Sequence, residues 1–145
     1  MTVTDTQMVF RSPKLGDVSY GPDDVIRFPQ GLPGFESLRE FLLVTREECE
    51  PFVFLASLER PDVTLPLMPL ALAAVGIELP DEVLAPLGAG GENALGYYAV
   101  VSIGRDAASI RANLRAPVVV NLDTRLGSQV ILQDESLPLD AALGA

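Results

Sequence analysis

The sequence contains no histidine and no tryptophan, and it has only one cysteine and one lysine. Without histidine the chain cannot build a Ser-His-Asp or Cys-His catalytic site, a histidine general base or a histidine-ligated zinc. The single cysteine, Cys49, cannot form an internal disulfide, which fits a reducing cytoplasm. Three glutamates close to Cys49 in the sequence disfavour a reactive thiolate, so we interpret this residue as structural.

Long apolar runs are also absent. No stretch approaches the roughly 18 uninterrupted apolar residues of a membrane-spanning helix, and the richest one, Leu65 to Leu79, is broken by Pro66 and Pro69. The N-terminal residues lack the basic start, apolar run and small-residue cleavage site of a secretory signal. We therefore expect a cytoplasmic protein with no membrane partner.

Positive charge is scarce. The chain carries 20 acidic and 10 basic residues, a net charge of −10. Between Asp17 and Glu82 there are 13 acidic and 4 basic residues, so this stretch alone has a net charge of −9. An acidic surface repels phosphate backbones, and we expect no direct binding to nucleic acid. The charge favours a basic protein partner; the alternative is that it only maintains solubility.

What is present is abundant apolar material in short runs. Apolar residues make up 48% of the 145 residues, enough for the core of one domain. Turn residues separate the runs, a spacing that predicts an all-β, mainly antiparallel fold in a compact, barrel-like domain. The expected strands are Gln7–Arg11, Asp17–Tyr20, Val25–Phe28, Phe41–Thr45, Phe52–Leu58, Val63–Met68, Ala94–Ile103, Val118–Leu122 and Ser128–Leu132.

Helix signals are weak. FESLREF predicts one helical turn after Gly34, with Glu36 near its positive end. The stretch 69–91 predicts one or two short helices interrupted by proline and glycine. We interpret residues 1–145 as a single domain with its core at about 9–132, followed by a loosely held tail at 133–145.

The most constrained stretch is FPQGLPGF, residues 28–35. It is not a phosphate-binding loop, because it lacks the lysine and hydroxyl that end a P-loop and the GxGxxG spacing of a dinucleotide site. Two linked turns remain, and Pro33-Gly34 suits the centre of a type II turn. We interpret the loop as a corner whose side chains pack into the core. The alternative is a preformed edge that binds a partner through Leu32 and Phe35.

A second cluster is RANLRAPVVVNLDTRLGSQVIL, which starts at Arg111. We expect Pro117 at the first position of a strand and DTRLG as a hairpin turn. Asn113 and Asn121 are expected to close local turns with their side chains. Arg111 and Arg115 are interpreted as a solvated or neutralised pair, with an anion site as the alternative.

Paired carboxylates are a further candidate for chemistry. Asp23-Asp24, Glu47-Glu48-Glu50 and Asp81-Glu82 all fall in polar turns, and no calcium-loop pattern occurs. Acid–base catalysis needs two carboxylates in different environments, one of them desolvated. We interpret these pairs as a solvated acidic face, and we expect no catalytic residue, cofactor or metal.

Three segments follow one another along the chain: FPQGLPGF with EFLLV after it, then FVFLASLERPDVTLPLM, then ANLRAPVVVNLDTRLGSQVIL. In these segments, over about Val9 to Leu132, the chain resembles the flagellar assembly factor FliW family. It implies a predominantly antiparallel, barrel-like domain without enzymatic activity. It also implies two partners, the basic translational regulator CsrA and flagellin, which exchange on the protein so that flagellin translation follows flagellin export.

One stretch departs from the family pattern. Met68-Pro69-Leu70 stands where members commonly carry Asp-Pro and an aromatic residue, so an acidic contact is missing there. For partner contacts we predict the exposed acidic residues Asp23, Asp24, Glu47 and Glu48 and the apolar residues Leu32 and Phe35. The alternatives are a small-ligand-binding barrel and a carboxylate-based hydrolase. In the barrel, the set Phe52, Phe54, Tyr97 and Tyr98 would line a pocket.

Overall fold

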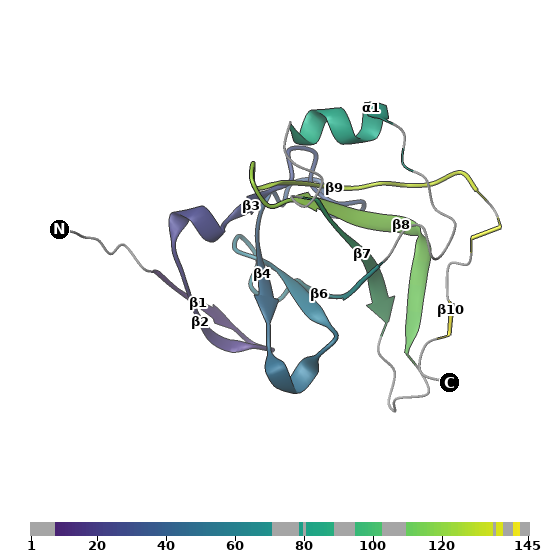
Figure 1. Cartoon of the computed structure of the whole chain (residues 1–145). Coiled ribbons are helices and arrows are strands. Elements are labelled where there is room, and N and C mark those ends of the chain that lie inside the picture. The colour runs from purple at the N-terminus through teal and green to yellow at the C-terminus, as the bar shows by residue number, and fades with distance from the viewer. Residues whose placement is uncertain are drawn as a thin grey trace.

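The computed structural model describes residues 8–70, 79, 81–88, 95–102, 110–134, 136–137 and 141–142, and most of them lie in strands (Figure 1). The strands are β1 (Met8–Ser12), β2 (Gly16–Tyr20), β3 (Ile26–Arg27), β4 (Glu40–Thr45), β5 (Val53–Ser57), β6 (Thr64–Pro69), β7 (Leu95–Ser102), β8 (Arg111–Asn121), β9 (Leu126–Gln129) and β10 (Ala141–Ala142). The helices are η1 (Pro22–Asp24), η2 (Glu47–Cys49), α1 (Asp81–Leu84) and η4 (Ala85–Leu87). The predicted all-β fold with short helices is confirmed.

Seven strands form a closed barrel. Hydrogen-bonded neighbours run in the order β8-β7-β6-β5-β4-β3-β9, and β9 pairs again with β8 to close the ring. All these pairings are antiparallel except that of β3 with β9, a single parallel bridge between Arg27 and Leu126. β1 and β2 form a separate hairpin, and β10 adds to the outside of β8. The closure of the barrel is therefore weakest at the β3–β9 seam.

The alternation of side chains along the strands explains the packing. In β8, Val118 and Val120 lie in the cluster inside the barrel, whereas Val119 packs outside it with Leu87 of η4. The β1–β2 hairpin covers the outer face of β4 and β5, where Phe10 packs in one cluster with Leu42. Strands buried on both faces read as continuous apolar runs, which is why VFLAS and PVVV were recognisable as strands.

Three expectations need correction. No helix follows Gly34, because residues 32–38 form turns that lead directly into β4. Pro117 lies inside β8 and not at its start; the register shifts opposite Tyr98, and an irregularity of this kind accommodates a residue without an N–H. The described part of the tail is held more closely than predicted, since Leu137 is buried and β10 pairs with β8.

Among the described residues, no helix has both the length and the hydropathy needed to cross a membrane.

Candidate functional site

The corner loop, residues 28–35, consists of two tight turns. The Gly31 N–H donates to the Phe28 carbonyl at 2.8 Å, and the Phe35 N–H donates to the Leu32 carbonyl at 2.7 Å. Gly34 has a φ of +85°, which the third position of a type II turn requires. The predicted type II turn is therefore confirmed.

The apolar side chains of the corner loop differ in how deeply they are buried. Phe28 is fully buried and meets the Phe41 ring edge-on at 5.1 Å, while Leu32 is 1% exposed in the same cluster. Phe35 is only partly buried and packs at the rim of this cluster. Leu32 is almost fully buried, because the second turn directs its side chain into the core. Phe35 keeps an accessible face.

Glu59 fixes the point where the corner loop re-enters the barrel. Its carboxylate accepts hydrogen bonds from the backbone N–H groups of Arg39, at 2.5 Å, and of Glu40, at 3.0 Å. These bonds stabilise the charged form and hold the pKa of Glu59 below its ordinary value of 4.5. Glu59 is exposed, so its effect is local: it satisfies two amides at the start of β4.

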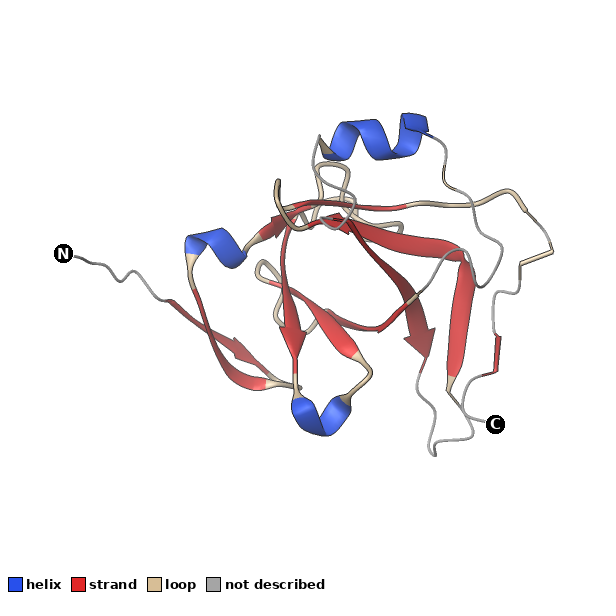
Figure 2. Ribbon diagram, viewed as in Figure 1, coloured by secondary structure: helices blue, strands red, loops and turns tan. Residues whose placement is uncertain are grey.

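The predicted acidic contacts lie on two separate short helices. Asp23 and Asp24 are exposed on η1, and Glu47 and Glu48 are exposed on η2. Figure 2 shows η1 at the upper left and η2 at the bottom, so the two acidic pairs form two patches and not one cluster. Their exposure leaves both patches accessible to a basic partner.

The seam that closes the barrel beside β9 is short, a single bridge to β3 in the described part of the chain. After the bridge between Arg27 and Leu126, the Arg27 N–H donates to the Arg125 carbonyl at 2.9 Å. The chain then enters the first turn of the corner loop, so among the described residues no strand pairs with the rest of β9 on this side. Gly127 lies beneath the Phe28 ring, where a Cβ atom would approach the ring to 2.6 Å.

Beyond Gly127, the hydrogen bonds to β8 show which backbone N–H and C=O groups face β8 and which face away from it. The Val130 N–H donates to the Pro117 carbonyl at 2.9 Å, and the Leu132 N–H donates to the Arg115 carbonyl at 2.7 Å. Because backbone groups alternate in direction along an extended chain, those of Gln129 and Ile131 point away from β8. Within the described part of the chain, they meet no backbone partner on that side.

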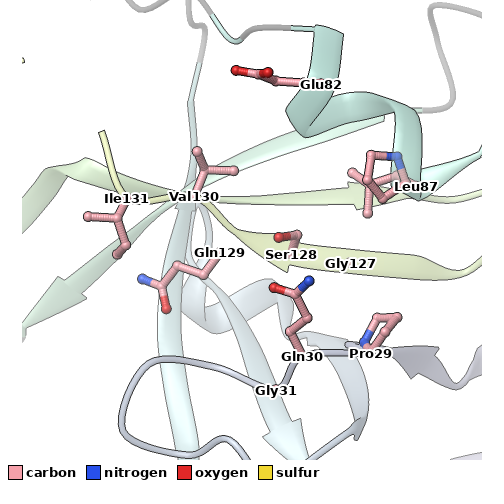
Figure 3. A pocket seen from close by; sticks show the side chains of 11 residues that line it. Pro29, Gln30, Gly31, Glu82, Leu87, Gly127, Ser128, Gln129, Val130 and Ile131 are labelled. Carbon is pink, nitrogen blue, oxygen red and sulfur yellow. The ribbon is translucent and has the colours of Figure 1, made fainter. Parts of the chain in front are cut away.

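Two cavities flank this free edge, and we call them together the seam groove. The helix-side cavity, about 330 Å³, lies among Pro29, Gln30, Leu87 and Glu82 of α1 (Figure 3). The loop-side cavity, about 260 Å³, is lined by Leu32, Pro33, Phe35 and Leu65. Gln129 and Ile131 line both cavities, and Ile131 is 56% exposed. The seam groove thus combines apolar walls with unpaired backbone groups.

No local sequence pattern indicates the seam groove. The strand predicted at Ser128–Leu132 overlaps β9 (Leu126–Gln129) only at its first two residues, and the pairing of its second edge depends on how the barrel closes. The asparagine predictions are confirmed: Asn113 Oδ1 accepts from the Arg115 N–H at 2.9 Å, and Asn121 closes the turn at 122–125. The Arg115 Nε donates to the Leu137 carbonyl at 2.7 Å, so this side chain anchors the tail.

The four residues proposed to line a pocket in the small-ligand alternative do not lie together. Phe52, Phe54, Tyr97 and Tyr98 pack in four different clusters, so they do not line one cavity. The acidic pairs of the hydrolase alternative are mostly exposed in turns and short helices. In the described ranges, no group of three or more Cys, Asp or Glu side chains is arranged to hold a metal ion.

The stretch that departs from the family pattern closes the end of β6. Met68 and Leu70 pack against a cluster outside the barrel, and the Leu70 N–H donates to the Tyr97 carbonyl at 2.9 Å. Pro69 is exposed. The apolar residues at 71–78 that follow lie outside the described residues. The described part of this edge is therefore apolar and presents no carboxylate.

Comparisons with known proteins agree with one another. The family described as "FliW protein" matches residues 9–143. The "Flagellar assembly factor FliW" of Caldicellulosiruptor saccharolyticus is 33% identical over 133 residues, covering 90% of this chain and 87% of the relative. That of Thermotoga neapolitana is 37% identical, covering 85% of each chain. A solved structure, "Crystal structure of the flagellar assembly factor FliW", aligns with a TM-score of 0.84 and 30% identity, covering 95% of this chain and 98% of that one.

Proposed function

Because the chain belongs to the FliW family of flagellar assembly factors, we propose that it is a cytoplasmic, non-enzymatic binder of two proteins. The first partner is a CsrA-type translational regulator, and the second is flagellin. The free protein binds the regulator and so permits translation of flagellin. Flagellin that accumulates in the cytoplasm displaces the regulator, and translation falls until flagellin is exported.

The observation that carries this proposal is a family match that spans nearly the whole chain, supported by the same fold in a solved relative. The charge supports it independently. A chain with a net charge of −10 attracts a basic, RNA-binding protein, and complementary charge accelerates association. The two exposed acidic patches on η1 and η2 are the surfaces that would provide this attraction.

Titration of the protein with purified CsrA tests the first partner. We expect a stoichiometric complex whose dissociation constant rises with salt, because exposed charges are screened. Absence of a complex at low salt would contradict the proposal for this partner.

Two double variants separate the acidic patches. Asp23→Lys with Asp24→Lys alters η1, and Glu47→Lys with Glu48→Lys alters η2 with the same change of charge. The patch nearer the bound regulator should show the larger loss of affinity and the larger fall in salt dependence. Equal losses in both variants would indicate that only the net charge matters.

Competition tests the exchange of partners. Purified flagellin, added to the preformed complex with CsrA, should release CsrA in proportion to the flagellin bound. A ternary complex that retains both partners would rule out the exchange, even if each partner binds separately.

A further inference from the structure

The seam groove has the features of a site for an extended polypeptide. Its floor is the chain from Gln129 to Ile131, where the N–H and C=O groups of Gln129 and Ile131 point into the groove without a backbone partner in the described part of the chain, while those of Val130 face β8. A free strand edge of this kind binds another chain by adding a strand, and the main-chain hydrogen bonds provide much of the affinity.

The walls define the side chains that the strand would carry. Successive side chains of an extended segment point to opposite faces, so alternate residues would enter the two cavities on either side of the edge. The loop-side cavity is apolar, with Phe35 and Leu65 in its wall, and Ile131 is exposed between the cavities. The strand is therefore apolar at alternate positions.

The charge in the groove is one-sided. Among the described residues that line it, the one ionisable side chain is that of Glu82, which extends from α1 on the helix side of β9 (Figure 3). A lysine or arginine at one end of the incoming strand would pair with Glu82, and a carboxylate there would be repelled. This selects a basic partner.

We propose that the seam groove binds an extended segment of the basic translational regulator by strand addition at Gln129 and Ile131. This inference rests on the proposed function and goes beyond it by naming the binding mode and the site. The corner loop has a direct part in it: its first turn leads the chain away from β9 and thereby opens the edge.

Amide hydrogen exchange on the intact protein, with and without purified CsrA, tests the binding mode. In the free protein the Gln129 and Ile131 amides should exchange rapidly, while that of Val130 is protected by its bond to the Pro117 carbonyl. Binding of CsrA should slow exchange at Gln129 and Ile131 at least 10-fold and leave Val130 nearly unchanged.

A matched pair of variants checks the same point. Ile131→Pro removes an N–H that bonds to no backbone group among the described residues, so the fold should be retained and CsrA affinity should fall at least 10-fold. Ile131→Val keeps the N–H and an apolar side chain, and should bind CsrA more tightly than Ile131→Pro. Glu82→Lys should weaken binding and should do so less at high salt.

The outcomes separate the two proposals. A complex with CsrA that leaves the Gln129 and Ile131 amides unprotected would overturn strand addition while the proposed function stands. Protection by flagellin but not by CsrA would overturn the choice of partner. Absence of any complex would overturn both.

Discussion

Two corners of the chain meet at the barrel seam, the corner loop at 28–35 and the turn at 122–125, and they are built in different ways. The turn at 122–125 is closed from within by Asn121, which is 1% exposed. Its Oδ1 accepts from the N–H groups of Asp123, at 2.9 Å, and Thr124, at 3.1 Å, and its Nδ2 donates to the Leu87 carbonyl at 3.2 Å. The hydrogen-bonding groups of the Asn121 side chain are therefore satisfied by backbone groups of the protein itself.

The corner loop divides its residues between the core and the surface. Phe28 and Leu32 are buried, although Leu32 also lines the loop-side cavity, whereas Phe35 is only partly buried and forms part of the wall of the seam groove. The comparison shows that a constrained loop can hold the fold together with one residue and present a surface with another. Substitutions in the two corners should therefore separate stability from binding.

The largest effect is expected for Phe28→Ala. It removes a fully buried ring that packs on Phe41 and on Gly127, and such truncations cost about 3–5 kcal/mol of unfolding free energy. Urea denaturation followed by circular dichroism measures this loss. A loss below about 1 kcal/mol would show that the corner does not anchor the core.

The two glycines of the corner loop form a matched pair. Both have positive φ, +67° at Gly31 and +85° at Gly34. A Cβ at Gly31 would lie 2.6 Å from the Glu36 carbonyl oxygen, whereas one at Gly34 meets nothing within 4 Å. We expect Gly31→Ala to cost about 2–4 kcal/mol and Gly34→Ala about 1 kcal/mol in the same denaturation assay. Equal losses of unfolding free energy would mean that the strain of the positive φ alone sets the cost and that the contact with Glu36 adds nothing.

For the opposite corner, Asn121→Ala should cost about 1–3 kcal/mol, because it removes a buried side-chain amide together with its hydrogen bonds to Asp123, Thr124 and Leu87. Binding of CsrA by the folded fraction should be unchanged, since Asn121 does not line the seam groove. Calorimetric titration below the melting temperature measures this. A clear loss of affinity would show that the turn, too, has a direct role in binding.

The smallest effect is expected for Glu59→Gln. The pKa of Glu59 is lowered in the folded protein, so its contribution is present above its ordinary pKa of 4.5 and is lost as the pH falls through the lowered value. For an exposed carboxylate this amounts to less than about 1 kcal/mol. Melting temperatures of the variant and the unaltered protein should converge as the pH is lowered; a constant difference would contradict this role.

The comparison also shows what the sequence can predict. Alternating apolar residues and turn signals located nine strands, and Pro33-Gly34 located a type II turn, because these features depend on neighbours along the chain. Three features depend on residues distant in the sequence: the burial of Leu32, the position of Pro117 within β8 and the pairing of β10. The free edge at Gln129 and Ile131 depends on how the barrel closes, so no local pattern could reveal it.

The most direct test of the account is Phe35→Ala, measured for stability and for CsrA affinity in the same preparation. Phe35 lines the seam groove and is only partly buried, so we expect a loss of about 1 kcal/mol or less in unfolding free energy together with at least a 10-fold loss of affinity. A variant that unfolds, or one that is stable and binds CsrA unchanged, would contradict the division of the corner loop between core and binding surface.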